Sequence, residues 1–163
     1  MHERLSIVDV ERGAQPLYDT KTKRVLAVNG EIYNHKDLAK KLDKTHDWQT
    51  HSDCEVLLYL YDEFGTEFLN EMDGIFSFCL YDPKTDEYFI ARDHIGIVPL
   101  YIGWDKDGVT YVSSELKAIE SYCQKIQEFP PGNYYDGISK QFKKWYDPDW
   151  AQEIPDEVVS LTK

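Results

Sequence analysis

The sequence has no cysteine pairing motif and no long apolar run, and each absence excludes a class of protein. Its 163 residues contain three cysteines, Cys54, Cys79 and Cys123, an odd number without C-x-x-C spacing. With an opening Met-His-Glu-Arg that lacks a charged-then-apolar leader, this predicts a reduced, cytoplasmic protein. No apolar stretch approaches the roughly 18 residues that a membrane span needs, so we expect no membrane partner.

The sequence also has few positively charged residues and no residue spacing typical of metal ligands. The chain has 18 Lys and Arg against 30 Asp and Glu, a net charge of -12, with no dense basic cluster. A strongly acidic chain is poorly suited to phosphate contacts, which argues against a nucleic-acid partner. The five histidines show no spacing such as H-E-x-x-H, so the sequence predicts no metal site.

The periodicity predicts one layered domain of antiparallel hairpins and two helices. Apolar and aromatic runs at 75–81 and 88–91, and at 100–104 and 109–112, flank turn residues. The run at 75–81 is apolar at nearly every position, so both of its faces should be covered. One helix is predicted from Asn34 to residue 42, and a second, more buried one starts at a capping box formed by Ser52 and Glu55.

The run Asn29-Gly30-Glu31-Ile32-Tyr33-Asn34 follows an apolar strand and allows two interpretations. Asn-Gly is a strong signal for a tight hairpin turn. The same run also gathers a side-chain amide, an unhindered backbone and a carboxylate, which are the groups that bind an amide substrate. Other segments decide between the two.

Several motifs along the chain carry a family resemblance. They are His-Glu-Arg-Leu-Ser-Ile-Val-Asp at 2–9, Gly-Ala-Gln-Pro-Leu at 13–17, Val-Asn-Gly-Glu-Ile-Tyr-Asn-His at 28–35, Ser-Asp-Cys-Glu at 52–55, Asp-Gly at 73–74, Ala-Arg-Asp-His at 91–94 with Gly96 and Pro-Leu-Tyr at 99–101, Ser-Glu-Leu-Lys-Ala at 114–118 and Phe-Pro-Pro-Gly at 129–132. Together they resemble the amidotransferase domain of glutamine-hydrolysing asparagine synthetases, which are class II glutamine amidotransferases of the N-terminal nucleophile hydrolase type. The resemblance implies an α+β fold, a four-layer αββα sandwich of antiparallel sheets, here lacking its first strand.

The resemblance also implies roles for five residues in binding L-glutamine. Arg4 would hold the α-carboxylate, which suits the two parallel donors of a guanidinium. Glu31 and Asp53 would bind the α-ammonium group. Asn29 through its side-chain amide and Gly30 through its backbone N–H would form the oxyanion hole, in which each donor is worth about 2.7–4 kcal/mol.

Two parts of the family pattern are missing from this sequence, namely the nucleophilic cysteine and the synthetase domain. The family's nucleophile is a cysteine that becomes the first residue after removal of Met, whereas His2 follows Met1 here. We therefore expect a fragment, truncated at both ends, that releases no ammonia from glutamine by itself. Residues 1–146 would be the glutaminase domain and 147–163 a linker toward a synthetase domain, and only that absent domain would bind ATP and Mg²⁺, so that no cofactor is expected in this chain.

The parent protein would hydrolyse glutamine and pass ammonia to the ATP-dependent amidation of aspartate, and the resemblance is compatible with a homodimer. Two alternatives stay open. The chain could belong to another class II amidotransferase, or it could be a non-catalytic glutamine-binding module. Arg92 and Asp93 are expected to be structural. His51 stands where a glycine often precedes the Ser-Asp pair, so the placement of Asp53 depends on the backbone there.

Overall fold

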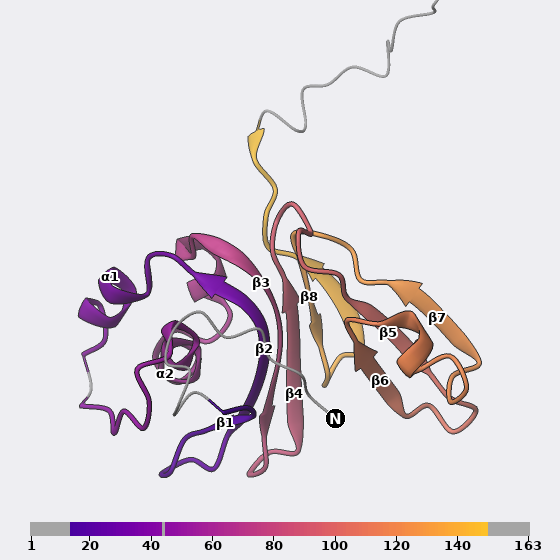
Figure 1. Ribbon diagram of the computed structural model, residues 1–163, viewed down its shortest axis with the longest axis horizontal. Helices are drawn as coiled ribbons and strands as arrows, with labels where there is room; N and C mark the ends of the chain where they lie inside the picture. The colour runs from indigo at the N-terminus through magenta and orange to yellow at the C-terminus, as the bar shows by residue number, and fades with distance from the viewer. Residues whose placement is uncertain (1–13, 44, 150–163) are drawn as a thin grey trace, which may run out of the picture.

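The chain folds as two antiparallel β-sheets that pack face to face. The computed structural model describes residues 14–43 and 45–149. Six strands form the larger sheet, in the order β1 (Leu17–Tyr18), β2 (Val25–Ile32), β3 (Gly74–Asp82), β4 (Glu87–Arg92), β8 (Asn133–Asp136) and β9 (Gln141–Lys144). The smaller sheet has the order β6 (Thr110–Ser113), β5 (Tyr101–Trp104) and β7 (Lys125–Glu128). Figure 1 shows the larger sheet between the helices and the smaller sheet.

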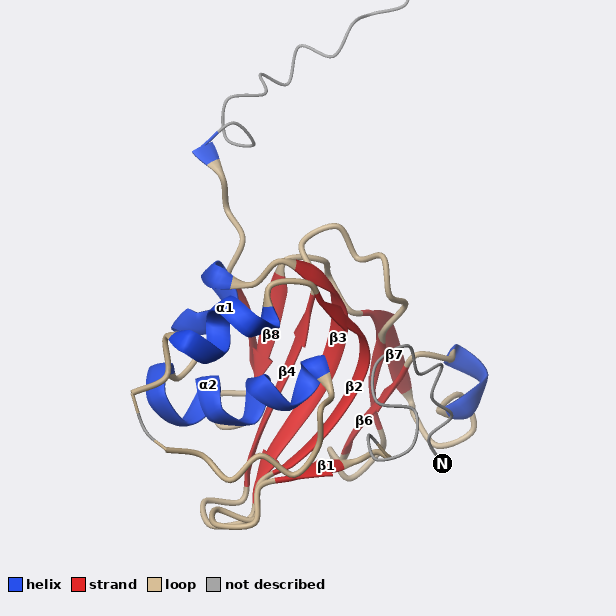
Figure 2. Cartoon of the chain, turned by 60° about the vertical axis from the view of Figure 1, so that its left-hand side comes forward, coloured by secondary structure: helices blue, strands red, loops and turns tan. Residues whose placement is uncertain are grey.

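The helices cover one face of the larger sheet, as Figure 2 shows. Helix α1 spans His35–Lys40 and α2 spans Val56–Phe64, and α2 is flanked in the chain by the 3₁₀ turns η1 (Asp53–Glu55) and η2 (Glu67–Glu71). None of the helices in the described part of the chain is long and apolar enough to cross a membrane. A further 3₁₀ turn, η3 (Leu116–Ala118), lies between β6 and β7 in the chain.

Two apolar clusters fill the spaces between these layers. Side chains alternate between the faces of a strand, so Phe76 and Phe78 of β3 pack toward the helices while Cys79 packs toward the smaller sheet. The second cluster, between the sheets, contains Ile90, Leu100, Ile102, Phe129 and Tyr135. β3 is therefore covered on both faces, as its continuous apolar sequence predicts. The predicted α+β sandwich of antiparallel sheets is confirmed.

The two hairpins also follow the sequence. The strands β3 and β4 pair with Asp82 opposite Glu87, and β5 and β6 pair with Trp104 opposite Thr110. Each pairing closes at a turn whose residues are typical of tight turns, and the second turn includes Gly108 at φ +80°. Residues 147–149 lead away from the sandwich (Figure 1), where the linker is predicted to begin.

The helix starts differ from their predicted details. Asn34 stands at the start of α1, but its side chain caps no helical N–H. Instead its amide nitrogen donates to the Glu71 carbonyl at 2.8 Å and its oxygen accepts the Asp73 N–H at 3.0 Å. Ser52 accepts the Cys54 N–H at 3.3 Å, as a capping residue should. Glu55 does not complete the capping box, because other groups occupy its carboxylate.

Candidate functional site

The Asn29-Gly30 pair lies within β2 and not in a hairpin turn. Asn29 stands opposite Ser77 and Gly30 opposite Phe76 in the β2–β3 ladder. Gly30 has φ +135°, and a Cβ built on it would lie 2.0 Å from the carbonyl oxygen of Ile75. Only glycine accommodates both conditions. The turn interpretation of this pair is therefore wrong, and the glycine is required because the backbone of β3 approaches so closely.

The N–H of Gly30 points to the outer edge of β2, away from β3. Hydrogen-bonding direction alternates along a strand. On that edge the Val28 N–H donates to the Gln15 side chain and the Ile32 N–H donates to the Asp53 carboxylate. Gly30 lies between these two positions, and among the residues that the structure describes none accepts its N–H. An unpaired donor thus stands between two paired ones.

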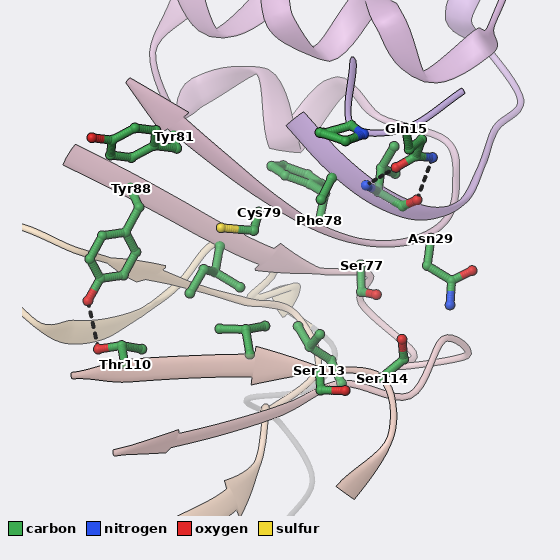
Figure 3. A pocket seen from close by; sticks show the side chains of 16 residues that line it. Gln15, Asn29, Ser77, Phe78, Cys79, Tyr81, Tyr88, Thr110, Ser113 and Ser114 are labelled. Atoms are coloured by element: carbon green, nitrogen blue, oxygen red, sulfur yellow. Dashed lines mark hydrogen bonds between the residues drawn. The ribbon is translucent and has the colours of Figure 1, made fainter. Parts of the chain in front are cut away.

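The Asn29 side chain projects from one face of β2 into a groove between the two sheets (Figure 3). The groove has a volume of about 760 Å³. Ser77 borders it on β3, and Ser113 and Ser114 border it from the direction of the smaller sheet. Asn29 is exposed, and no hydrogen bond joins its amide to any other described residue. Within residues 14–43 and 45–149, the side-chain amide of Asn29 and the N–H of Gly30 are therefore two donors on adjacent residues that no acceptor occupies.

Two carboxylates stand at the same end of β2. Asp53 is only 6% exposed, and its Oδ2 accepts the Ile32 N–H at 2.8 Å. Glu31, half-buried, directly precedes Ile32 in the chain. Neither carboxylate forms an ion pair with a cation of the described part of the chain. Buried or half-buried acidic groups without a cation are suited to a positively charged ligand.

The position of Asp53 depends on a segment that the sequence did not predict to be functional. The Glu55 carboxylate accepts the N–H groups of Gln49 and Thr50, both at 2.7 Å, and the Tyr59 hydroxyl at 2.9 Å. It thereby ties the segment before η1 to α2. His51 has no positive φ, so the missing glycine at that position introduces no backbone strain. In the sequence, this anchor shows only as a glutamate three positions after Ser52, which is the spacing of a capping box.

Arg92 and Asp93 make structural contacts, in agreement with the role expected of them. The buried Arg92 guanidinium donates to the carbonyls of Val98, Gly96 and Phe129 at 2.6–2.8 Å. Asp93 accepts N–H groups of the loop that follows it, including the Gly96 N–H at 2.6 Å. The backbone N–H of Asp93 also donates to the carbonyl of Phe76, at 2.8 Å, on the strand that faces Gly30.

The cysteines are free thiols but are poorly suited to act as nucleophiles. Burial raises the pKa of the Cys79 thiol to about 11, so little thiolate exists at neutral pH. Cys54 is buried, and its Sγ lies 3.7 Å from the carbonyl oxygen of Gly30. Desolvation also raises the pKa of Cys123. Among His, Cys, Asp and Glu side chains at 14–43 and 45–149, no group of three could hold a metal ion.

The structure therefore brings together four of the five predicted site residues, namely Asn29, Gly30, Glu31 and Asp53, at one end of β2. Arg4 lies outside the described residues, as does most of the predicted linker. The sequence did not single out Gln15, whose side chain bonds to β2 directly before Asn29.

The chain is similar to a family of known proteins. Residues 1–146 match the family described as "Glutamine amidotransferase domain". The chain is 52% identical over 149 residues to asparagine synthetase B [glutamine-hydrolyzing] of Escherichia coli, covering 91% of this chain and 27% of that protein. It is 50% identical over 151 residues to a probable asparagine synthetase [glutamine-hydrolyzing] of Dictyostelium discoideum, again covering 91% and 27%. The chain thus spans about a quarter of the length of these relatives.

A solved structure shares the fold. The glutamine phosphoribosylpyrophosphate amidotransferase of B. subtilis, complexed with ADP and GMP, superposes with a TM-score of 0.67 and 26% sequence identity. The match covers 82% of this chain and 32% of that one. The family match extends over most of the sequence and includes β2 and η1, the elements that carry the site. This chain belongs to the glutamine amidotransferase domain family and is homologous to the glutamine-hydrolysing asparagine synthetases.

Proposed function

We propose that this chain binds L-glutamine at the edge of β2 and supplies the oxyanion hole and the ammonium site of a glutaminase. The observation that carries the proposal is the Gly30 N–H, which no described residue accepts, next to the Asn29 amide, which no described residue contacts by a hydrogen bond, on a strand edge where Val28 and Ile32 are paired. An edge strand leaves its outward N–H groups open unless other groups cover them; here side chains cover those of Val28 and Ile32, and no described residue covers that of Gly30 between them.

The chemistry follows from the groups that the site offers. The carboxamide oxygen of glutamine would accept hydrogen bonds from Asn29 and Gly30, which stabilise negative charge on that oxygen when a nucleophile attacks the amide carbon. Glu31 and Asp53 would hold the α-ammonium group. Arg4 is assigned to the α-carboxylate by resemblance to the family. Hydrolysis converts glutamine and water into glutamate and ammonia.

We propose further that the longer protein is a glutamine-hydrolysing asparagine synthetase. Its synthetase domain, which would bind ATP and Mg²⁺, would use the ammonia to amidate aspartate. The support is about 50% identity to such enzymes over nearly the whole chain. The three free thiols fit a reducing compartment, so we assign the protein to the cytoplasm.

The proposal is tested by titrating the chain with L-glutamine in a calorimeter. We expect saturable binding that Asn29→Ala weakens about tenfold, because a hydrogen bond to the ligand that is worth about 1.4 kcal/mol corresponds to that factor. Asn70→Ala is the matched control: Asn70 is exposed on η2 and does not line the groove, so its replacement should leave the affinity unchanged.

Two results would overturn the proposal. One is a folded wild-type chain that shows no glutamine binding at millimolar concentration. The other is an Asn29→Ala chain that binds glutamine as tightly as the Asn70→Ala control, which would place the ligand elsewhere. Substitution of Asp53 by Asn tests the ammonium site separately, because it removes the charge and keeps an acceptor for the Ile32 N–H.

A further inference from the structure

The side chain of Gln15 replaces a peptide group in the β-ladder beside the site. β1 pairs Leu17 with Leu26 of β2, and the same antiparallel register continued by two residues places position 15 opposite Val28. β1 does not extend that far. Instead the Gln15 side-chain amide makes both bonds of a ladder pair: Nε2 donates to the Val28 carbonyl and Oε1 accepts the Val28 N–H, each at 2.7 Å. Figure 3 draws both bonds.

The two hydrogen bonds between Gln15 and Val28 fix the backbone next to the two donors of the site. The Val28 carbonyl belongs to the peptide group that also contains the Asn29 nitrogen, so holding it sets the direction in which β2 enters Asn29. On the other side of Gly30, Asp53 holds the Ile32 N–H at 2.8 Å. Gly30 therefore lies between two residues of one strand edge, Val28 and Ile32, that side chains hold by hydrogen bonds. A free edge would be able to twist at this point, because backbone that lacks hydrogen bonds opens and moves more readily.

We infer that Gln15 is a positioning residue that holds Asn29 and Gly30 in the geometry required to bind the carboxamide oxygen of glutamine. The inference rests on the glutamine site proposed above. Both ends of the Gln15 amide are occupied by Val28, so Gln15 acts through the strand and not on the ligand. Donors in an oxyanion hole depend on being held in place before the ligand arrives, which is what a bidentate clamp on the adjacent peptide provides.

A purely structural role for Gln15 predicts a different outcome, and two ligands separate the two roles. L-glutamine and L-norvaline share the α-amino and α-carboxyl groups, but norvaline ends in a methyl group where glutamine has its carboxamide. Loss of the two hydrogen bonds between Gln15 and Val28 should weaken the binding of glutamine about tenfold, as expected for the loss of one hydrogen bond to the ligand. Norvaline binding, which uses the ammonium site, should stay within about twofold, well below that tenfold step. General loosening of the fold would weaken both ligands equally.

The experiment uses the full chain with Gln15→Met, which has nearly the same length and volume but cannot form either bond. Ligand affinities are measured by NMR titration, at a temperature at which the variant is fully folded. Gln141→Met is the matched control, since Gln141 is exposed on the edge strand β9. Gln15→Glu is the second variant: it keeps an acceptor for the Val28 N–H but places a second carboxylate oxygen against the Val28 carbonyl. It should therefore also lose glutamine affinity selectively.

The outcomes are distinct. Selective loss of glutamine binding in Gln15→Met and Gln15→Glu, with shifted Gly30 and Asn29 amide resonances in the free protein, supports the positioning role. Unchanged glutamine affinity in both variants, or an equal loss for the two ligands, overturns it while the proposed function stands. A wild-type chain that binds no glutamine overturns the proposed function and this inference together.

Discussion

Replacement of Gly30 by alanine should destabilise the fold far more than the same replacement at an open glycine. An ideal Cβ at Gly30 lies 2.0 Å from the Ile75 carbonyl oxygen and 2.7 Å from the Phe76 Cα, at φ +135°. Backbone strain for a non-glycine residue costs about 1–3 kcal/mol, and forcing two packed strands apart costs about 1–3 kcal/mol more. We therefore expect Gly30→Ala to lose about 2–6 kcal/mol of unfolding free energy.

Thermal and urea unfolding followed by circular dichroism would measure this loss. For a chain of this length, each kcal/mol lowers the Tm by about 2–4 °C, so a fall of about 5–20 °C is expected. Gly108→Ala is the matched control, because Gly108 also has a positive φ, +80°, but a Cβ at this position would meet no other atom within 4 Å. It should lose only the strain contribution, about 1–2 kcal/mol. If both variants unfolded at the same urea concentration, the close approach of β3 to Gly30 would be refuted.

Three further predictions concern the rest of the fold. Arg92→Met should lose about 3 kcal/mol or more in urea unfolding, because two buried backbone carbonyls and a part-buried one would lose their donor; a loss below about 1 kcal/mol would contradict this. Hydrogen bonding to Lys143 lowers the pKa of Asp136 from its ordinary 3.8 to about 2. The stabilisation from this pair is therefore fully present above about pH 4 and lost as the pH falls toward about 2, so Asp136→Asn should flatten the acid-unfolding curve in that window; an unchanged curve would count against the pair. The raised pKa of Cys79, about 11, predicts that its alkylation by iodoacetamide, followed by mass spectrometry, is slow at about pH 7.5 and accelerates up to about pH 10; fast labelling at neutral pH would disprove this.

Local patterns were sufficient to predict the hairpins and the buried helix. Each hairpin consists of two apolar runs and a turn within a few residues, so the contacts that define it are close in sequence. The apolar residues around the circumference of α2 likewise predict its burial without knowledge of its partners. These elements needed no information from distant parts of the chain.

The Asn29-Gly30 pair could not be placed by local reasoning, because a distant strand decides its conformation. Asn-Gly by itself favours a turn, but the β3 backbone at Ile75 and Phe76 holds Gly30 in an extended strand. The capping box predicted at Glu55 is also wrong because residues outside the local pattern decide where its side chain bonds. Its position fits a capping box, yet the segment at 49–50 and the Tyr59 hydroxyl occupy its carboxylate.

The short length of β1 explains how one dipeptide can offer two donors of different kinds. A residue in the middle of a sheet uses its N–H in the ladder on one side or the other. An edge strand leaves every second N–H free, while its side chains still alternate between the two faces. In the part of the chain from residue 14 on, β1 pairs with β2 through Leu17 and Tyr18 alone, and the Gln15 side chain covers Val28 without extending the strand further. Among the described residues, none accepts the next edge N–H, that of Gly30, which lies in the plane of the sheet, while the Asn29 amide stands perpendicular to it in the groove. A longer β1 would pair with that N–H, and the site would lose its backbone donor.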